Sequence, residues 1–341
     1  MQLSNTQQRI DHVRRDLLKR LFGVTALATL CTNLPFNAAY AGVDSLKVAD
    51  ATPQKITEHL YLLAARGAWP THENQGFFAN IYFVKTPKGI VVLDTGTSVH
   101  IGEMALRAIK KQFNQPVIAV FNSHYHGDHW LGNGAFKTAF PEAPIYAHPD
   151  AKIAIENAVG AEWLEQMMKA TEGAVKGTQV VAPTEGVTHG QIFDFGGVQL
   201  KVHSYGQAHS PVDIMIEIVN DKALYVGDVI MEKRIGNPSE TSFKGYIKTL
   251  NIIQTEMPEH LLLPGHGKPG KGELLQAYQD IMNGIYDNAV KGVAEGLDIS
   301  QTKELALKDP RIHQHAKSIA GFEEFGKFVS IAYTQAEMDA F

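Results

Sequence analysis

The stretch His124-Tyr125-His126-Gly127-Asp128-His129 places four side chains that can bind metal ions within six residues. It directly follows an apolar run, residues 117–121, that is typical of a buried strand. Alternate residues of a strand point to opposite sides, so His124 and His126 can share one ion only if the chain turns here, and Gly127 permits a turn. Imidazole and carboxylate groups in a loop at a strand end suit zinc and similar ions. The stretch therefore predicts a metal site.

Further candidate ligands stand at three other predicted strand ends. His209 lies in a turn that contains Gly, Ser and Pro, between two strand-like runs. Asp228 follows an apolar run in a Gly-Asp turn, and His266 lies between two glycines after another apolar run. Each of these residues alone fits an ordinary loop, but with the first stretch they complete a set of ligands. His203 is an alternative to His209, although it ends a strand directly and lacks the surrounding Gly and Pro residues.

These residues resemble, in type and in order, the ligands of the metallo-β-lactamase superfamily of dinuclear metallohydrolases. The resemblance covers about residues 56–268, and the segment 90–96 resembles the strand and turn that open this fold. Asp94 in that turn would support a ligand from outside the coordination sphere, with an ordinary turn residue as the alternative. The resemblance implies ligands for two ions: His124, His126 and His209 for one, Asp128, His129 and His266 for the other, and Asp228 as the bridge.

Predicted strands and helices alternate from residue 56 to residue 266. Strand-like runs occupy residues 81–85, 90–93, 117–121, 144–147, 198–202, 214–219, 223–226 and 260–263. Helical patterns occupy residues 100–111, 151–171 and 242–256, and the chain reads as helical from residue 272 onward. We expect an α/β fold in which helices enclose two sheets, the αββα sandwich of the resembled family, with a C-terminal helical extension.

Three segments are expected along the chain: a signal peptide (residues 1–41), a catalytic domain (residues 42–271) and a C-terminal helical extension (residues 272–341) that packs on the same domain. A dimer contact through the extension is the alternative, so a homo-oligomer stays open.

The N-terminus has the pattern of an export signal. Arg14-Arg15 forms a twin-arginine pair, an apolar segment covers residues 21–30, and Ala39-Tyr40-Ala41 is a small-residue cleavage site. This order predicts a twin-arginine signal peptide and a periplasmic or secreted protein, with an amphipathic first helix as the alternative. The apolar segment is too short to span a bilayer, so we expect no integral membrane segment in the mature chain. Cys31 is the only cysteine, and its loss with the leader would leave no thiolate ligand.

Charge argues against a nucleic-acid partner. Cleavage after Ala41 would remove five of the 31 basic and two of the 36 acidic residues, which leaves a formal charge of −8. A protein that binds the phosphate backbone is expected to carry a basic face instead. We therefore expect a small-molecule substrate.

The resemblance implies a hydrolase in which a hydroxide bridging two zinc ions attacks a small ester, thioester, lactone or amide, with Asp128 as the catalytic residue that handles protons. Iron and manganese accept many of the same donors and stay alternatives to zinc. The order of a signal peptide followed by this catalytic domain also resembles exported hydrolases associated with sulfur-oxidation and quinoprotein gene clusters. That resemblance leaves the substrate open.

Three alternatives stay open: lactam hydrolysis in the strict sense, iron-dependent oxidation or reduction of sulfur compounds, and metal binding by an accessory protein without turnover. Lactam hydrolases of this fold usually carry Cys or Ser where this chain has Asp228. The diiron redox members typically have Glu at the position of His126. Trp69 could grip an apolar substrate group, and Lys233 and Arg234 could bind a substrate carboxylate, with exposed loop positions as the alternative for all three.

The twin-arginine interpretation generates a direct test. Changing Arg14→Lys together with Arg15→Lys is expected to leave the protein in the cytoplasm with its leader uncleaved, because the export machinery reads the arginine pair. Cell fractionation and the mass of the recovered chain measure both effects. Normal export of the double variant would contradict the twin-arginine route.

Overall fold

The computed structural model describes residues 47–340, so the predicted signal peptide (residues 1–41) lies outside the described residues. The first sheet has the strand order β1 to β7: β1 (Gln54–Lys55), β2 (Leu60–Leu63), β3 (Ile81–Thr86), β4 (Gly89–Leu93), β5 (Val117–Phe121), β6 (Ile145–Ala147) and β7 (Glu185–Gly186). The second sheet has the order β12 (Leu261–Pro264), β11 (Ala223–Gly227), β10 (Met215–Ile218), β9 (Gln199–His203) and β8 (Ile192–Asp194).

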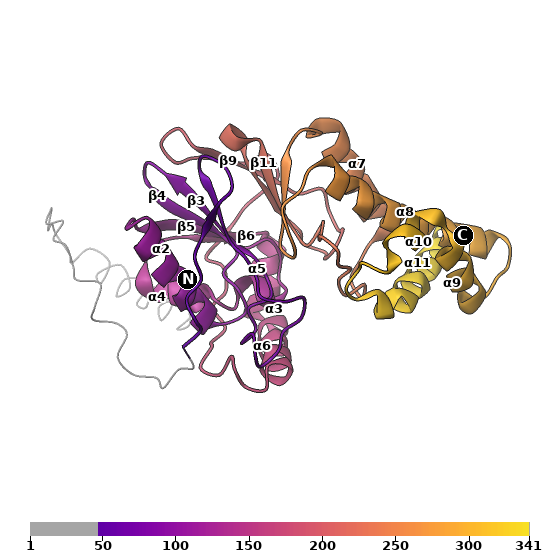
Figure 1. Ribbon diagram of the computed structural model, residues 1–341, viewed down its shortest axis with the longest axis horizontal. Helices are drawn as coiled ribbons and strands as arrows, with labels where there is room; N and C mark the ends of the chain where they lie inside the picture. Colours follow the sequence, from indigo (N-terminus) through magenta and orange to yellow (C-terminus); the bar gives the residue numbers. More distant parts are fainter. Residues whose placement is uncertain (1–46, 341) are drawn as a thin grey trace, which may run out of the picture. The chain divides into compact units, whose positions relative to one another are not determined.

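The two sheets pack face to face through alternating apolar residues. Leu62, Val91 and Phe121 of the first sheet share a buried cluster with Val202 and Ile216 of the second. Because side chains of a strand alternate between its two faces, the neighbouring residues point outward and need a second cover. Helices supply that cover on both sides (Figure 1).

The outer face of the first sheet packs against α2 (Val99–Gln112) and α4 (Asn133–Ala139). The outer face of the second sheet packs against α7 (Phe243–Glu256), α8 (Gly272–Ala294) and α11 (Phe325–Ala340). The order of layers is therefore helix, sheet, sheet, helix, which confirms the predicted αββα fold with C-terminal helices. The other helical segments are α3 (Gly127–Trp130), α5 (Pro149–Glu156), α6 (Ala158–Ala170), α9 (Ile299–Lys308), α10 (Pro310–Ala316) and the 3₁₀ turns η1 (Val219–Asp221) and η2 (Phe322–Glu324).

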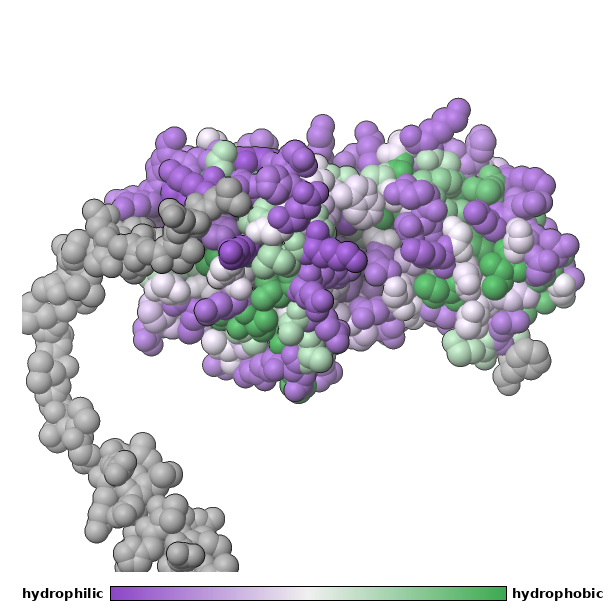
Figure 2. Space-filling model, turned by 90° about the horizontal axis from the view of Figure 1, so that it is seen from below, coloured by the Kyte–Doolittle hydropathy of each residue, from purple (hydrophilic) through white to green (hydrophobic). Residues whose placement is uncertain are grey.

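The C-terminal helices continue the core of the sandwich. Leu224 and Leu262 of the second sheet belong to the same buried cluster as Met282 of α8 and Val329 of α11. None of the helices within residues 47–340 combines the length and the apolar composition that crossing a bilayer requires. Apolar residues reach the surface around α6 and over the C-terminal helices (Figure 2).

One predicted helix is wrong. Residues 151–171 were expected to form a single helix, but α5 ends at Glu156 and α6 starts at Ala158. Asn157 between them has a ψ of −144°, which is not helical, and its side chain donates a hydrogen bond to the carbonyl of Ile153 at 2.7 Å. A short amide side chain competes in this way with the helical backbone. The other predicted elements agree with the structure to within about two residues.

Truncation of Met282 tests the shared core. Met282→Ala is expected to lower the stability of the whole protein by about 2–5 kcal/mol in a single thermal transition, because it leaves a cavity in a fully buried cluster. Met338→Ala is the matched control, since Met338 is 68% exposed on the last helix and should change the midpoint little. Two separate thermal transitions, of which Met282→Ala lowers the midpoint of only one, would show that the C-terminal helices unfold independently.

Candidate metal centre

The candidate ligands lie just after four strands, on loops and, for Asp128 and His129, in the short helix α3. The stretch that begins at His124 follows β5, and His209 lies between β9 and β10. Asp228 follows β11 directly, and His266 follows β12. β4 and β5 are parallel, as are β11 and β12, so within each pair the carboxyl ends meet at one edge of the sheet.

The chain turns within the first stretch as the sequence predicts. His126 has extended backbone angles and precedes α3, whose first residue is Gly127. Gly127 is needed for a close contact, because a Cβ atom there would lie 3.0 Å from Trp163 Cβ and 2.9 Å from Leu131 Cδ1. The turn lets His124 and His126 approach each other, with ring centroids 4.6 Å apart.

The structure gathers all seven predicted ligands into two buried groups. Within each group the donor atoms lie within 4.8 Å of one another. His124, His126 and His209 form the first group, in which His126 Nδ1 and His209 Nε2 are 3.0 Å apart. The second group consists of Asp128, His129, Asp228 and His266.

Asp228 contacts both groups. Its Oδ2 lies 3.6 Å from His209 Nε2 in the first group and 3.3 Å from His266 Nε2 in the second. Its Oδ1 lies 3.4 Å from His129 Nε2. Asp228 is therefore positioned between the groups, as the bridging role requires.

Several donor atoms lack a hydrogen-bond partner among the described residues although they are buried. These atoms are His124 Nε2, His129 Nε2, His266 Nε2 and Asp228 Oδ1. A buried polar atom without a partner costs free energy, so such atoms are rare in folded proteins. Divalent cations would satisfy all of them, and neutral imidazoles with carboxylates suit zinc and its neighbours in the periodic table. The residues present thus fit two ions.

Outer partners orient three of the imidazoles. Asp94 Oδ2 accepts a hydrogen bond from His129 Nδ1 at 2.5 Å, Glu240 Oε2 lies 3.1 Å from His126 Nε2, and the carbonyl of Phe78 lies 2.9 Å from His266 Nδ1. When the outer nitrogen donates its proton, the inner nitrogen keeps a free lone pair for an ion. Asp94 thus contacts His129 as predicted.

Asp94 is itself tightly held. It is fully buried, and its carboxylate accepts hydrogen bonds from the Ser123 backbone N–H at 2.7 Å and from the Tyr225 hydroxyl. Its φ of 58° lies in the left-handed region, which Asp tolerates better than most side chains.

Electrostatics keep the carboxylates of the centre ionised and two of the imidazoles neutral. Burial raises the pKa of Asp228, but the charges of His266 and His129 outweigh it and hold the pKa well below its ordinary value. Burial, reinforced by His126, lowers the pKa of His209 to about 3. Burial and the charge of His129 likewise hold the pKa of His124 well below its ordinary value. Ionised Asp and neutral His are the forms that bind cations. Burial lowers the pKa of His129, but the charges of Asp128, Asp228 and Asp94 outweigh it and raise the pKa well above its ordinary value, so this imidazole must release its proton when an ion binds.

Asp213 secures the loop that carries His209. Its carboxylate accepts hydrogen bonds from the Ser210 backbone N–H at 2.8 Å and the Ser210 hydroxyl at 2.7 Å. Burial raises the pKa of Asp213 to about 6, although the bonds from Ser210 oppose that rise.

A pocket of about 190 Å³ opens onto the two groups. Besides four of the ligands, its lining includes Trp69, Phe78, Trp163, Met167 and Arg234. Two of the three predicted substrate contacts, Trp69 and Arg234, therefore face the pocket. Lys233 is absent from the lining, and its side chain is 69% exposed and pairs with Glu232 at 3.7 Å.

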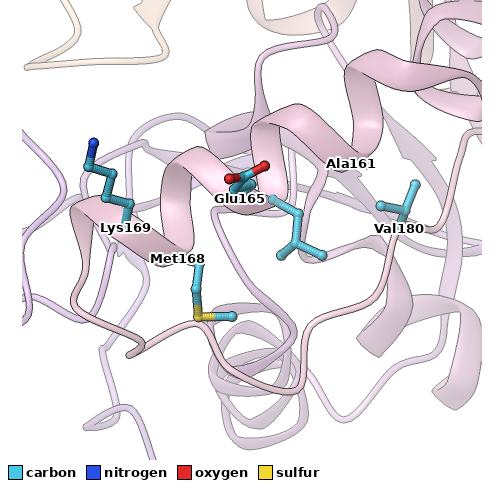
Figure 3. A pocket seen from close by; sticks show the side chains of 6 residues that line it. Ala161, Glu165, Met168, Lys169 and Val180 are labelled. Carbon is cyan, nitrogen blue, oxygen red and sulfur yellow. The ribbon is translucent and has the colours of Figure 1, made fainter.

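A second hollow lies on the other side of α6. It has a volume of about 430 Å³, and Met168 and Val180 face it from the helix and from the following loop (Figure 3). Its lining contains no histidine or aspartate. This hollow therefore offers none of the histidine and aspartate side chains that make up the two metal groups.

The structure separates the two candidates for the third histidine ligand, His203 and His209. His203 ends β9 and contacts Glu217 Oε2 at 2.8 Å and the Tyr205 hydroxyl at 2.9 Å, outside both metal groups. His209, and not His203, belongs to the first metal-candidate group. Glu240 was not predicted, because it lies in an irregular loop where one carboxylate gives no recognisable pattern.

The chain is similar to known metallohydrolases in sequence and in fold. The family model described as the metallo-beta-lactamase superfamily matches residues 74–266. The chain is 24% identical over 232 residues to metallo-beta-lactamase IND-1 of Chryseobacterium indologenes, covering 67% of this chain and 87% of that protein. It is 22% identical over 266 residues to a linear primary-alkylsulfatase of Pseudomonas sp. (strain ATCC 19151), covering 67% of this chain but only 50% of that protein.

Solved structures agree in fold. A metallo-beta-lactamase from Pontibacter korlensis superposes with a TM-score of 0.55 at 21% identity, covering 69% of this chain and 99% of that one. A double mutant of the sec-alkyl sulfatase PisA1 gives a TM-score of 0.58 at 16% identity, covering 74% of this chain and 45% of that one.

Single substitutions test whether the two groups bind ions separately. His124→Ala and His266→Ala are each expected to lose about one ion per chain, from different groups, because each removes one donor of a small set. Elemental analysis of the purified variants gives the count. His203→Ala is the control and should retain the wild-type metal content. Two tightly held ions in both His124→Ala and His266→Ala would contradict the assignment.

Proposed function

The chain belongs to the metallo-β-lactamase superfamily of metal-dependent hydrolases, and within it we propose that the protein is a dinuclear zinc hydrolase that cleaves a small ester, thioester, lactone or amide. The observation that carries this proposal is the position of Asp228, whose two carboxylate oxygens contact donor atoms of both groups. A carboxylate shared in this way holds two cations close together.

Two bound divalent ions would supply a water that ionises near neutral pH and a Lewis acid for the oxygen of the bond under attack. His124, His126 and His209 would hold one ion, and Asp128, His129 and His266 the other. The transfer of protons is carried out by the protein's own residues. Asp128 lines the pocket and is buried beside His129 and His266. Burial raises the pKa of its carboxyl, but these two histidines outweigh that effect and hold the pKa well below its ordinary value. Its ionised carboxylate can take a proton from the attacking water and return it to the leaving group.

The pocket favours a small substrate. Its volume of about 190 Å³ is less than the 300–1,000 Å³ typical of sites for drug-sized ligands. Trp163 and Met167 of α6 and Phe78 form apolar walls that exclude water and accept an apolar group of the substrate.

Zinc is preferred over iron because the centre presents five imidazoles and two carboxylates. His126 is one of these imidazoles, where a third carboxylate would favour a redox-active iron pair. Lactam hydrolysis is the second candidate, since relatives of this chain are named metallo-beta-lactamases. Asp228 at the bridge argues against it, and turnover of the chromogenic lactam nitrocefin measures it directly.

We also propose that the enzyme works outside the cytoplasm. The twin-arginine pattern at Arg14-Arg15 supports this location, because that route exports proteins that have already folded around their metal ions.

Replacement of the bridging carboxylate tests the proposed function. Asp228→Asn removes one negative charge between the two groups, so we expect loss of at least one ion and a fall in hydrolytic rate at neutral pH by about two orders of magnitude or more, with the fold retained. A panel of small esters, thioesters, lactones and amides gives the rate, and elemental analysis and thermal melting give the metal content and stability.

A purely structural role for Asp228 would give a different result in the same variant. If Asp228 only stabilises a Gly-Asp turn, the variant loses some stability but keeps both its metal content and its rate. Full activity with two ions bound would exclude the bridging role.

A further inference from the structure

Helix α11, which lies beyond the residues 74–266 that the family model matches, contacts the loop before α7 through one side chain. Gln335 of α11 accepts a hydrogen bond at its Oε1 from the Phe243 backbone N–H at 2.9 Å, and its Nε2 donates to the Thr241 carbonyl at 2.7 Å. Ser242 between them is the N-cap of α7. The first N–H groups of a helix have no partner within it, so Gln335 supplies one from outside. The amide of Gln335 thus clamps the start of α7.

Apolar packing fixes the same point. Phe243 is fully buried, and its ring centroid lies 6.0 Å from that of Tyr286 on α8 and 6.4 Å from that of Phe328 on α11. Ala208, the residue before His209, belongs to the same buried cluster as these helices. The C-terminal helices therefore form a wall against which the loop that carries His209 packs.

The clamp reaches His209 through the N-cap residue of α7. The Ser242 backbone N–H donates to the Ala208 carbonyl at 3.0 Å, directly before His209. Gly245 in the first turn of α7 leaves no space between the helix and this loop, because a Cβ atom there would lie 1.7 Å from the Gln207 carbonyl oxygen. Since closely packed groups cannot move independently, a shift of the start of α7 must also shift the loop of His209.

The clamp reaches His126 through Glu240, which directly precedes Thr241. The Glu240 carbonyl accepts a hydrogen bond from Gln207 Nε2 at 2.7 Å, and Glu240 Oε2 lies 3.1 Å from His126 Nε2. Two of the three histidines of the first group are thus held by residues that adjoin the segment clamped by Gln335.

A different part of the chain holds the loop of the second group. The Nδ2 of Asn80, just before β3, donates to the carbonyls of Pro264 at 2.9 Å and Gly267 at 2.7 Å, and the Asn80 backbone N–H donates to the Gly265 carbonyl at 2.7 Å. These carbonyls lie on both sides of His266 in the chain. The segment that opens β3 therefore fixes His266, whereas the C-terminal helices fix the histidines of the first group.

We propose that Gln335 is a positioning residue of the first group. By clamping Thr241 and Phe243 it holds His209 and Glu240 in place, so that the C-terminal helix α11 raises the metal affinity of the first group and leaves that of the second unchanged. The presence of an ion in the first group rests on the proposed function. The clamp itself rests on the hydrogen bonds of Gln335.

Hydrogen–deuterium exchange of the purified protein tests the clamp. Gln335→Met keeps the approximate length of the side chain but removes both hydrogen bonds, so we expect exchange in residues 207–210 and 240–243 to become about tenfold faster, which corresponds to the loss of one or two hydrogen bonds. Exchange in residues 264–268, which include His266, should change less than about twofold. Equal acceleration in all three segments, as a general loss of stability would give, or no change in residues 207–210 would overturn the proposal.

Two further variants serve as controls for the exchange experiment. Gln276→Met makes the same substitution on the exposed side of α8, where Gln276 Nε2 donates to Asp280 of the same helix at 2.8 Å, and it should leave exchange in residues 207–210 unchanged. Gln335→Glu keeps an oxygen that accepts from the Phe243 N–H but loses the donor to Thr241, so an intermediate acceleration is expected. Thermal melting checks that the three variants fold. An acceleration in Gln276→Met as large as that in Gln335→Met would contradict a specific role of Gln335.

Zinc affinity shows whether the clamp acts on the ligands themselves. It is measured by competition with a chelator in two backgrounds: His266→Ala, which keeps the three histidines of the first group, and His124→Ala, which keeps the second group. We expect added Gln335→Met to weaken zinc binding about tenfold in the His266→Ala protein, the lower end of the range for residues that support a metal ligand. In the His124→Ala protein the change should stay below about twofold.

Failure of this inference can be told apart from failure of the proposed function. Equal changes of zinc affinity in the two backgrounds would overturn the positioning role of Gln335. Fewer than two zinc ions per chain in the wild type would count against the proposed dinuclear hydrolase, whereas the exchange in residues 207–210 decides the role of Gln335 at any metal content.

Discussion

The structure depends on a set of buried polar atoms that have no hydrogen-bond partner within residues 47–340. Imidazole nitrogens of His124, His129 and His266 and one oxygen of Asp228 meet in the interior, where an unpaired polar atom costs on the order of 1–3 kcal/mol. Such a cluster is stable in a folded protein only if another species satisfies it, and we propose that two divalent cations do so for all of these atoms together. The free energy of metal binding is thereby coupled to the stability of the loops that carry the ligands.

The sandwich is built so that these loops meet. Its inner core is apolar, and Tyr225 extends from this core to Asp94, which in turn orients His129. A chain of hydrogen bonds therefore links the packing of the two sheets to the direction of a metal ligand. Through the same architecture the C-terminal helices reach the rim of the pocket, where Gly321 adjoins Trp69. Core, metal centre and pocket wall are consequently parts of one folded unit.

Much of this arrangement follows from sequence patterns that are local. The ligand stretch from His124 to His129, and the strands before Asp228 and His266, combine apolar runs with turn residues, and such patterns predict both the element and the site at its end. The features that were missed depend on contacts between distant residues. Asn157 breaks a helix through its own side-chain hydrogen bond, and Glu240 reaches His126 from a loop without periodicity. The difference between Lys233 and Arg234 is likewise set by tertiary packing, because neighbours in an irregular segment point in different directions.

We propose that two ions share the carboxylate of Asp228. Anomalous X-ray diffraction at the zinc absorption edge, from crystals of the metal-replete protein, tests it most directly because it locates each ion independently of activity. We expect two anomalous peaks, one among His124, His126 and His209 and one among Asp128, His129 and His266, with Asp228 contacting both. A single peak, or two peaks with the Asp228 carboxylate turned away from either, would contradict it.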